Sequence, residues 1–142
     1  MKKYIFLILA SALMLVSCSK EEESIMDDLI GTYSLIGSQY VTWGRDSGTL
    51  NVNSKIFITS TGKDTFRVGG YYQTTGKVVG NMIYFDSYRT SDSAGYMDIA
   101  ISPTMLIGNT INISDTASGQ LASNGVLYPF TGRVTAVATK MN

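Results

Sequence analysis

Apolar and polar residues alternate with a period of two along most of the chain from residue 31 onward. This is the pattern of β-strands with one buried and one solvated face. It predicts strands over 31–43, 96–101, 110–114 and 126–138, and no segment in this region has a helical period. Two further strands are predicted by Leu50, Val52, Ile56 and Ile58, with a bulge at Asn53-Ser54, and by Phe66, Val68 and Tyr72.

Turn residues divide these strands into hairpins. Gly80-Asn81 and Gly108-Asn109 each separate two apolar runs by two residues, which predicts tight hairpin turns. Thr61-Gly62-Lys63-Asp64 is a further predicted turn, and Pro129 indicates an edge position or a bulge near the start of the last strand.

About eight sequential strands favour an all-β fold, an antiparallel up-and-down meander closed into a small barrel. A β-sandwich is the alternative that periodicity leaves open. A membrane-spanning barrel is disfavoured, because it needs apolar-out strands of roughly 9–11 residues with aromatic girdles. The strands of this chain are predicted to be shorter, with a polar second face.

The N-terminus has the layout of a secretory signal. Lys2 and Lys3 precede an uncharged run from Tyr4 to Val16. This run is shorter than the roughly 20 residues that a membrane-spanning helix needs. We therefore expect residues 1–17 to be a cleaved signal peptide.

The residues at the expected cleavage site, Leu15-Val16-Ser17-Cys18, resemble a bacterial lipobox. The resemblance implies that Cys18, the only cysteine, is lipidated. The residues that follow, Ser19-Lys20-Glu21-Glu22-Glu23, are similar to the acidic tag of Bacteroidetes-type surface lipoproteins. We expect a lipid anchor in the outer membrane with the protein exposed on the cell surface, residues 18–28 as a flexible acidic tether, and one domain over 29–142.

The start of this domain resembles lipocalin-like, or calycin-like, proteins, which open with Gly-x-Trp. Gly31-Thr32-Tyr33 matches this motif with Tyr in place of Trp. The resemblance implies a β-barrel around a ligand cup, with Arg133 in the last strand packed over Tyr33. The C-terminal helix of lipocalins has no counterpart in this sequence.

Composition narrows the possible chemistry. The chain has no histidine, and Cys18 is committed to lipid, so nucleophilic triads and His/Cys zinc sites are excluded. Positive charges are scattered, which gives no support to nucleic-acid binding. We predict no enzyme activity, no cofactor and no metal site. A carboxylate pair would have to come from Asp64, Asp86, Asp92, Asp98 or Asp115, and a calcium site from Asp86, Asp92, Ser93 and Asp98. Solvated turn and surface positions explain most of these aspartates better.

Aromatic residues are the remaining candidates for a binding site, because Tyr and Trp offer large faces with a polar handle. The set is Tyr40, Trp43, Tyr71, Tyr72, Tyr84, Tyr88 and Tyr96. We predict a non-catalytic binding module for an apolar small molecule or a glycan. The predicted ligand-binding residues are Tyr33, Val41, Trp43, Phe66, Tyr72 and Ile99. The alternative is an interaction protein with a filled barrel, such as an adhesin or an envelope-complex subunit, whose protein partner is unknown.

Overall fold

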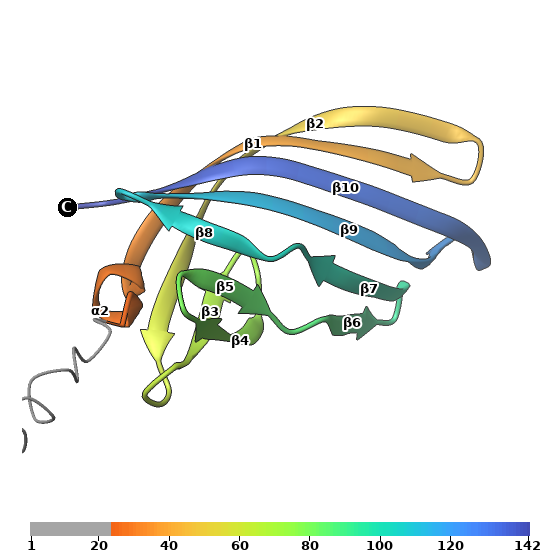
Figure 1. Cartoon of the computed structure of the whole chain (residues 1–142). Helices are drawn as coiled ribbons and strands as arrows, with labels where there is room; N and C mark the ends of the chain where they lie inside the picture. Colours follow the sequence, from red (N-terminus) through yellow and green to blue (C-terminus); the bar gives the residue numbers. More distant parts are fainter. Residues whose placement is uncertain (1–23) are drawn as a thin grey trace, which may run out of the picture.

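The computed structural model describes residues 24–142, which form ten β-strands and one short helical turn (Figure 1). The elements are α2 (Met26–Leu29), β1 (Gly31–Trp43), β2 (Asp46–Ser60), β3 (Thr65–Gly70), β4 (Thr74–Val79), β5 (Met82–Phe85), β6 (Tyr88–Asp92), β7 (Gly95–Ile101), β8 (Thr104–Ile107), β9 (Thr110–Ser123) and β10 (Val126–Lys140). The predicted signal peptide, Cys18 and residues 19–23 lie outside the described residues. Within residues 24–142, no helix has the length and apolar character needed to cross a membrane.

All strand pairs are antiparallel and belong to a single sheet in the order β10-β1-β2-β3-β4-β5-β8-β9. The sheet closes because β9 also pairs with β10. This ring confirms the predicted all-β, barrel-like meander, and the sandwich alternative is wrong because the strands form one continuous sheet. Closure satisfies the edge hydrogen bonds that an open sheet would leave exposed.

The β6–β7 hairpin departs from the predicted simple meander. It lies outside the ring, because β5 pairs directly with β8 and β7 pairs with β9. The length of β9, 14 residues, allows this arrangement. Its first residues pair with β8, whereas its later part, from Asp115 to Leu121, pairs with β7. The prediction that the strands are shorter than about 9–11 residues is wrong for β1, β2, β9 and β10, which have 13, 15, 14 and 15 residues.

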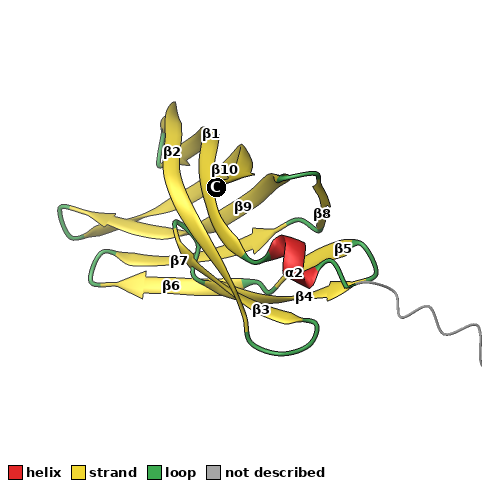
Figure 2. Ribbon diagram, turned by 90° about the vertical axis from the view of Figure 1, so that its left-hand side faces the viewer, coloured by secondary structure: helices red, strands yellow, loops and turns green. Residues whose placement is uncertain are grey.

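The molecule consequently has two different ends, which Figures 1 and 2 show from two sides. At the closed end, all eight strands of the ring are present and α2 lies at the base. At the open end, the outer halves of β1, β2, β9 and β10 continue beside β6 and β7. Among the strands of residues 24–142, two edges have no neighbour there, since β2 pairs with β3 only from Ile56 onward and β6 pairs only with β7.

The hydrophobic core fills the closed end. Tyr33, Leu35, Ile56, Phe66 and Ile83 are completely buried there. Phe66 also packs edge-on against Phe85 with 5.6 Å between ring centroids. Inward side chains from opposite sides of the ring therefore meet and leave no open cup at this level.

The α2 turn caps the base of this core. Met26 and Leu29 are buried, and the Tyr33 hydroxyl donates a 2.7 Å hydrogen bond to the carbonyl of Leu29. Burial, together with the charge of Asp28, raises the pKa of Tyr33 to about 12. Residues 26–28, which fall within the expected tether 18–28, are therefore part of the packed α2 turn.

The turn predictions are confirmed at Gly80-Asn81 and Gly108-Asn109, where each glycine adopts a positive φ near 60°. The predicted bulge at Asn53-Ser54 is wrong, because β2 pairs with β1 in unbroken register through both residues. Pro129 lies just past the end of β1, where its carbonyl accepts a hydrogen bond from Gly44. Its missing N–H therefore breaks no bond to that strand.

The predicted contact between Arg133 and Tyr33 is also wrong. Tyr33 lies opposite Lys140 in the β1–β10 ladder, whereas Arg133 lies opposite Tyr40. Arg133 and Tyr40 are exposed on the outer face. The spacing along β10 puts Arg133 on the opposite side of the sheet from the buried Val134.

Candidate functional site

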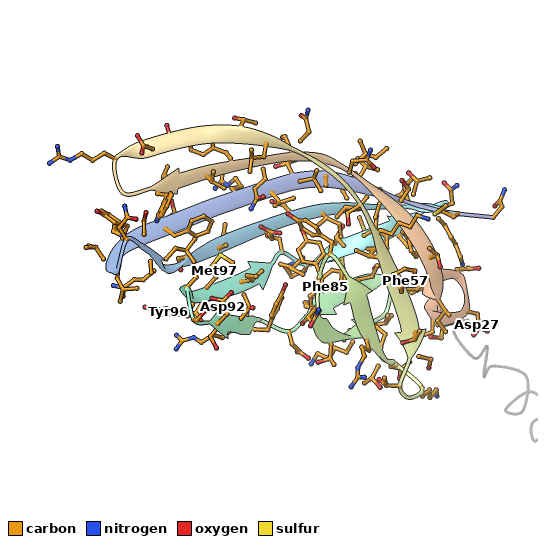
Figure 3. All side chains as sticks on the ribbon, turned by 180° about the vertical axis from the view of Figure 1, so that it is seen from behind. Asp27, Phe57, Phe85, Asp92, Tyr96 and Met97 are labelled. Atoms are coloured by element: carbon orange, nitrogen blue, oxygen red, sulfur yellow. The ribbon has the colours of Figure 1, made fainter. Side chains whose placement is uncertain are left out.

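A half-open cavity of about 360 Å³ lies where the closed ring passes into the open end. It is within the range of about 300–1,000 Å³ typical of small-molecule sites. Figure 3 shows Met97, one of its lining residues, at the opposite end of the molecule from Asp27. The cavity is lined by Gln39, Tyr71, Tyr72, Gln73, Tyr88, Arg89, Thr90, Met97, Ile99, Asp115, Ala117 and Val134.

A buried carboxylate lies at the floor of this cavity. Asp115 is only 4% exposed and Tyr72 only 2%. The Tyr72 hydroxyl donates a 2.5 Å hydrogen bond to Oδ2 of Asp115, and the main-chain N–H of Val134 donates to Oδ1 at 3.2 Å. Because Tyr72 also belongs to the core cluster, this pair separates the core from the cavity.

Burial dominates the electrostatics of the pair. It raises the pKa of the Asp115 carboxyl although both hydrogen bonds favour the charged form. Burial also raises the pKa of the Tyr72 hydroxyl, and the hydrogen bond to Asp115 adds to that shift. Tyr72 is therefore a neutral donor toward a carboxylate that is costly to ionise in place.

Two more tyrosines form the walls above Asp115. The rings of Tyr71 and Tyr72 meet edge to face with centroids 4.9 Å apart. Tyr88 enters from β6, and the nearby main chain of Gln73 partly offsets the rise in the pKa of its hydroxyl. Burial raises the pKa of both Tyr71 and Tyr88, and the nearby charge of Asp115 raises each further. Three phenol groups thus surround one carboxylate.

Arg89 stands at the rim and is held on the outer face. Its guanidinium forms a bidentate pair with Asp98 at 2.7 and 2.8 Å and lies 4.5 Å from the ring centroid of Tyr96. The pair lowers the pKa of Asp98. These contacts hold an Arg89–Asp98 ion pair beside the mouth of the cavity.

The predicted ligand-binding residues separate into three groups. Tyr72 and Ile99 line the cavity. Tyr33 and Phe66 are instead completely buried in the core at the closed end. Val41 and Trp43 lie farther along β1, on the inner face of the open end. The structure therefore does not bring the six residues together in one cup.

The inner face of the open end is a second apolar surface, formed by strand ends that extend past the ring. Trp43 packs edge-on against Tyr128 with 6.1 Å between centroids, and its indole N–H donates to the carbonyl of Leu121 at 3.4 Å. Trp43 and Tyr128 nevertheless remain 38% and 39% exposed, and Leu50 is 57% exposed. We call these residues, Trp43, Leu50 and Tyr128, the apolar overhang.

The other aspartates considered from the sequence serve local structure. Asp92 accepts a hydrogen bond from the N–H of Ala94 within the β6–β7 turn, and Asp86 accepts one from the hydroxyl of Thr75. Asp98 is paired with Arg89. In the part of the chain that the structure describes, no three acidic, histidine or cysteine side chains gather as a metal site would require.

The prediction that the aspartates occupy solvated turn and surface positions is wrong for Asp115, which is buried, although the sequence contained a signal of this burial. Ile111 and Ile113 alternate with polar residues, and the same alternation puts Asp115 on the inward face. A lone carboxylate on a dry face is costly unless it is hydrogen-bonded.

No family model, curated protein or solved structure matches this chain.

Proposed function

We propose that this protein is a non-catalytic binding module that holds a small, polyhydroxylated ligand, such as one or two sugar units, in the cavity at the open end. The observation that carries the proposal is the lining: three tyrosines around the buried carboxylate of Asp115, with the side-chain amides of Gln39 and Gln73. Aromatic faces stack on the apolar faces of sugars, while carboxylate and amide groups bind hydroxyls.

The lining favours a glycan over a purely apolar ligand. An apolar molecule would cover the side-chain amides of Gln39 and Gln73 without offering them hydrogen bonds, and each buried unpaired group costs about 1–3 kcal/mol. A hydroxyl-rich ligand can instead donate to Asp115 and accept from the hydroxyl of Tyr88, whereas the Tyr72 hydroxyl already donates to Asp115. Ile99, Met97 and Ala117 supply a smaller apolar wall.

The test is a glycan-array screen followed by calorimetry on the positive glycans. Tyr88→Ala should weaken binding at least tenfold, because Tyr88 is a half-buried wall of the cavity. Tyr84→Ala is the matched control, since Tyr84 is 37% exposed on the outer face of β5. Equal effects of the two substitutions, or binding to no glycan, would contradict the proposal.

We further propose that the module is a lipoprotein of the outer membrane, anchored through Cys18 and exposed on the cell surface. The support is the charged start, the short apolar run and Leu15-Val16-Ser17-Cys18. Intact-mass analysis of the mature protein should give residues 18–142 with added acyl chains. Cys18→Ala should abolish the acyl mass and leave the domain folded.

A second candidate function, docking of a protein partner, is favoured by the apolar overhang. Exposed aromatic and aliphatic side chains on one concave face are typical of interaction surfaces. Trp43→Ala should weaken partner binding without changing glycan affinity. Tyr88→Ala should have the opposite selectivity, which distinguishes the two functions.

A further inference from the structure

The outer surface of the closed end carries exposed apolar side chains across three neighbouring strands. Val79 lies opposite Met82, and Met82 lies opposite Met105. Ile107 follows on the same face of β8, because side chains alternate along a strand. Val79, Met105 and Ile107 are 55%, 42% and 58% exposed. We call these four residues the apolar stripe.

The border of the apolar stripe has a distinctive composition. Lys77 and Tyr84 lie opposite each other on the same outer face, one step along from Val79 and Met82. A tyrosine with a polar tip and a lysine with a long apolar stem are suited to the boundary between hydrocarbon and lipid headgroups. Isolated apolar residues on a surface are ordinary, whereas a contiguous set with this border indicates a contact surface.

The apolar stripe ends close to the point where the chain enters the fold. The turn after Ile107 contacts the end of β10, where the N–H of Lys140 donates to the carbonyl of Asn109 at 2.8 Å. The Lys140 ammonium in turn donates to the carbonyl of Asp28 in α2 at 2.6 Å. Figure 1 shows α2, the C-terminus and the β8–β9 turn at the same end of the molecule.

The length of the preceding chain limits how far this end can stand from a lipid anchor. Only six residue steps separate Cys18 from Ser24, the first residue of the described part. Even fully extended, they reach roughly 20 Å at about 3.5 Å per residue. A lipid on Cys18 therefore keeps the closed end within reach of the bilayer surface.

We infer that the apolar stripe rests in the interfacial layer of the membrane that holds the anchor, so that the domain lies against the bilayer with its cavity directed away. This inference depends on the proposed lipidation of Cys18. The contact is apolar rather than electrostatic, because α2 contributes Asp27 and Asp28 at this end. It should form on zwitterionic phosphatidylcholine and depend little on salt.

The test uses the mature acylated protein in phosphatidylcholine vesicles. Lipidation consumes the only native thiol, so Met105→Cys supplies a single site for an environment-sensitive fluorophore. We expect blue-shifted emission that is quenched by lipids carrying a spin label near the headgroup. The matched control is Ser47→Cys, exposed on β2 at the open end, which should keep water-like emission without quenching.

The outcomes separate the two proposals. If the protein carries acyl chains but Met105→Cys resembles Ser47→Cys, the membrane contact is refuted and the anchor stands. If the mature protein carries no acyl chain, both the lipid anchor and the membrane contact are refuted. Replacement of Ile107 by Glu in the labelled Met105→Cys protein should at least halve the quenching, and unchanged quenching would also refute the contact.

Discussion

The closed end and the open end are built from the same long strands with the same alternation, yet their inward side chains differ in how far they are buried. Leu35 on β1 is fully buried at the closed end. Leu50 on β2 also faces inward, but it is 57% exposed at the open end. The difference arises because β3, β4, β5, β8 and α2 complete the enclosure only at the closed end.

This comparison shows that alternation decides where a side chain points, whereas its burial depends on what stands opposite. The cavity lies at the transition between the two ends. Asp115 is there on the inward face of β9, one alternation step beyond the buried Ile113 and one before the half-buried Ala117. A polar group at this level can be shielded by Tyr72 and still border an opening.

The sharpest way to break the comparison is one substitution made at both ends. Leu35→Ala should lower the free energy of unfolding by about 2–5 kcal/mol, because it leaves a cavity in a packed core. Leu50→Ala should cost less than about 1 kcal/mol, because its side chain is already largely in water. Urea unfolding followed by circular dichroism measures both. Similar losses would mean that the open end is as tightly enclosed as the closed end.

Proline substitution tests the two ends within one strand. The Lys55 carbonyl accepts from Tyr71 on the β3 side, so alternation directs the N–H groups of Phe57 and Asn51 to that same side. Phe57→Pro should cost about 2–3 kcal/mol beyond Phe57→Ala, because β3 pairs there. Asn51→Pro should cost less than about 1 kcal/mol, since β3 is absent at its level. Equal thermal unfolding of the two proline variants would show that the edge of β2 is not free.

Adjacent tyrosines test the boundary between core and cavity. Tyr72→Phe should lower stability by about 1–2 kcal/mol, because it removes the donor from the buried Asp115 carboxylate. Tyr71→Phe is the control and should cost only a few tenths of a kcal/mol, since its hydroxyl makes an exposed 3.5 Å contact with Gln39. If the two variants unfold at the same urea concentration, Asp115 does not depend on Tyr72.

The smallest expected effect is a pH dependence specific to Asp115. Burial raises its pKa in the folded state above the ordinary value of about 3.9. The stability linked to its protonated form is therefore fully present below that ordinary value and is lost as pH rises through the raised pKa. The free energy of unfolding of wild type should therefore fall relative to that of Asp115→Asn as pH rises from about 4. A constant difference from pH 4 to 7 would contradict the raised pKa.

Much of the fold was predictable from local signals. The bounds of β1 agree with the predicted segment 31–43, and both Gly-Asn turns were recognised because a positive φ strongly favours glycine. The site was only partly predictable. Tyr72 and Ile99 were expected to line the cavity, but Tyr33 and Phe66 were expected there and lie in the core. No strand was predicted over Tyr88–Asp92, and the predicted strand 96–101, which belongs to β7, pairs with β9 instead of joining the ring in sequence order.

Residue types and their local order dictate the strands, their inward faces and most turns of this protein, and they exclude histidine and disulfide chemistry. These properties depend on neighbours a few residues apart, so they can be predicted from the sequence. The closure of the ring, the site of the β6–β7 hairpin and the burial of Asp115 depend on pairings such as β1 with β10 and β7 with β9. Those pairings join distant segments, and only the folded chain decides which inward faces are covered and which border a cavity.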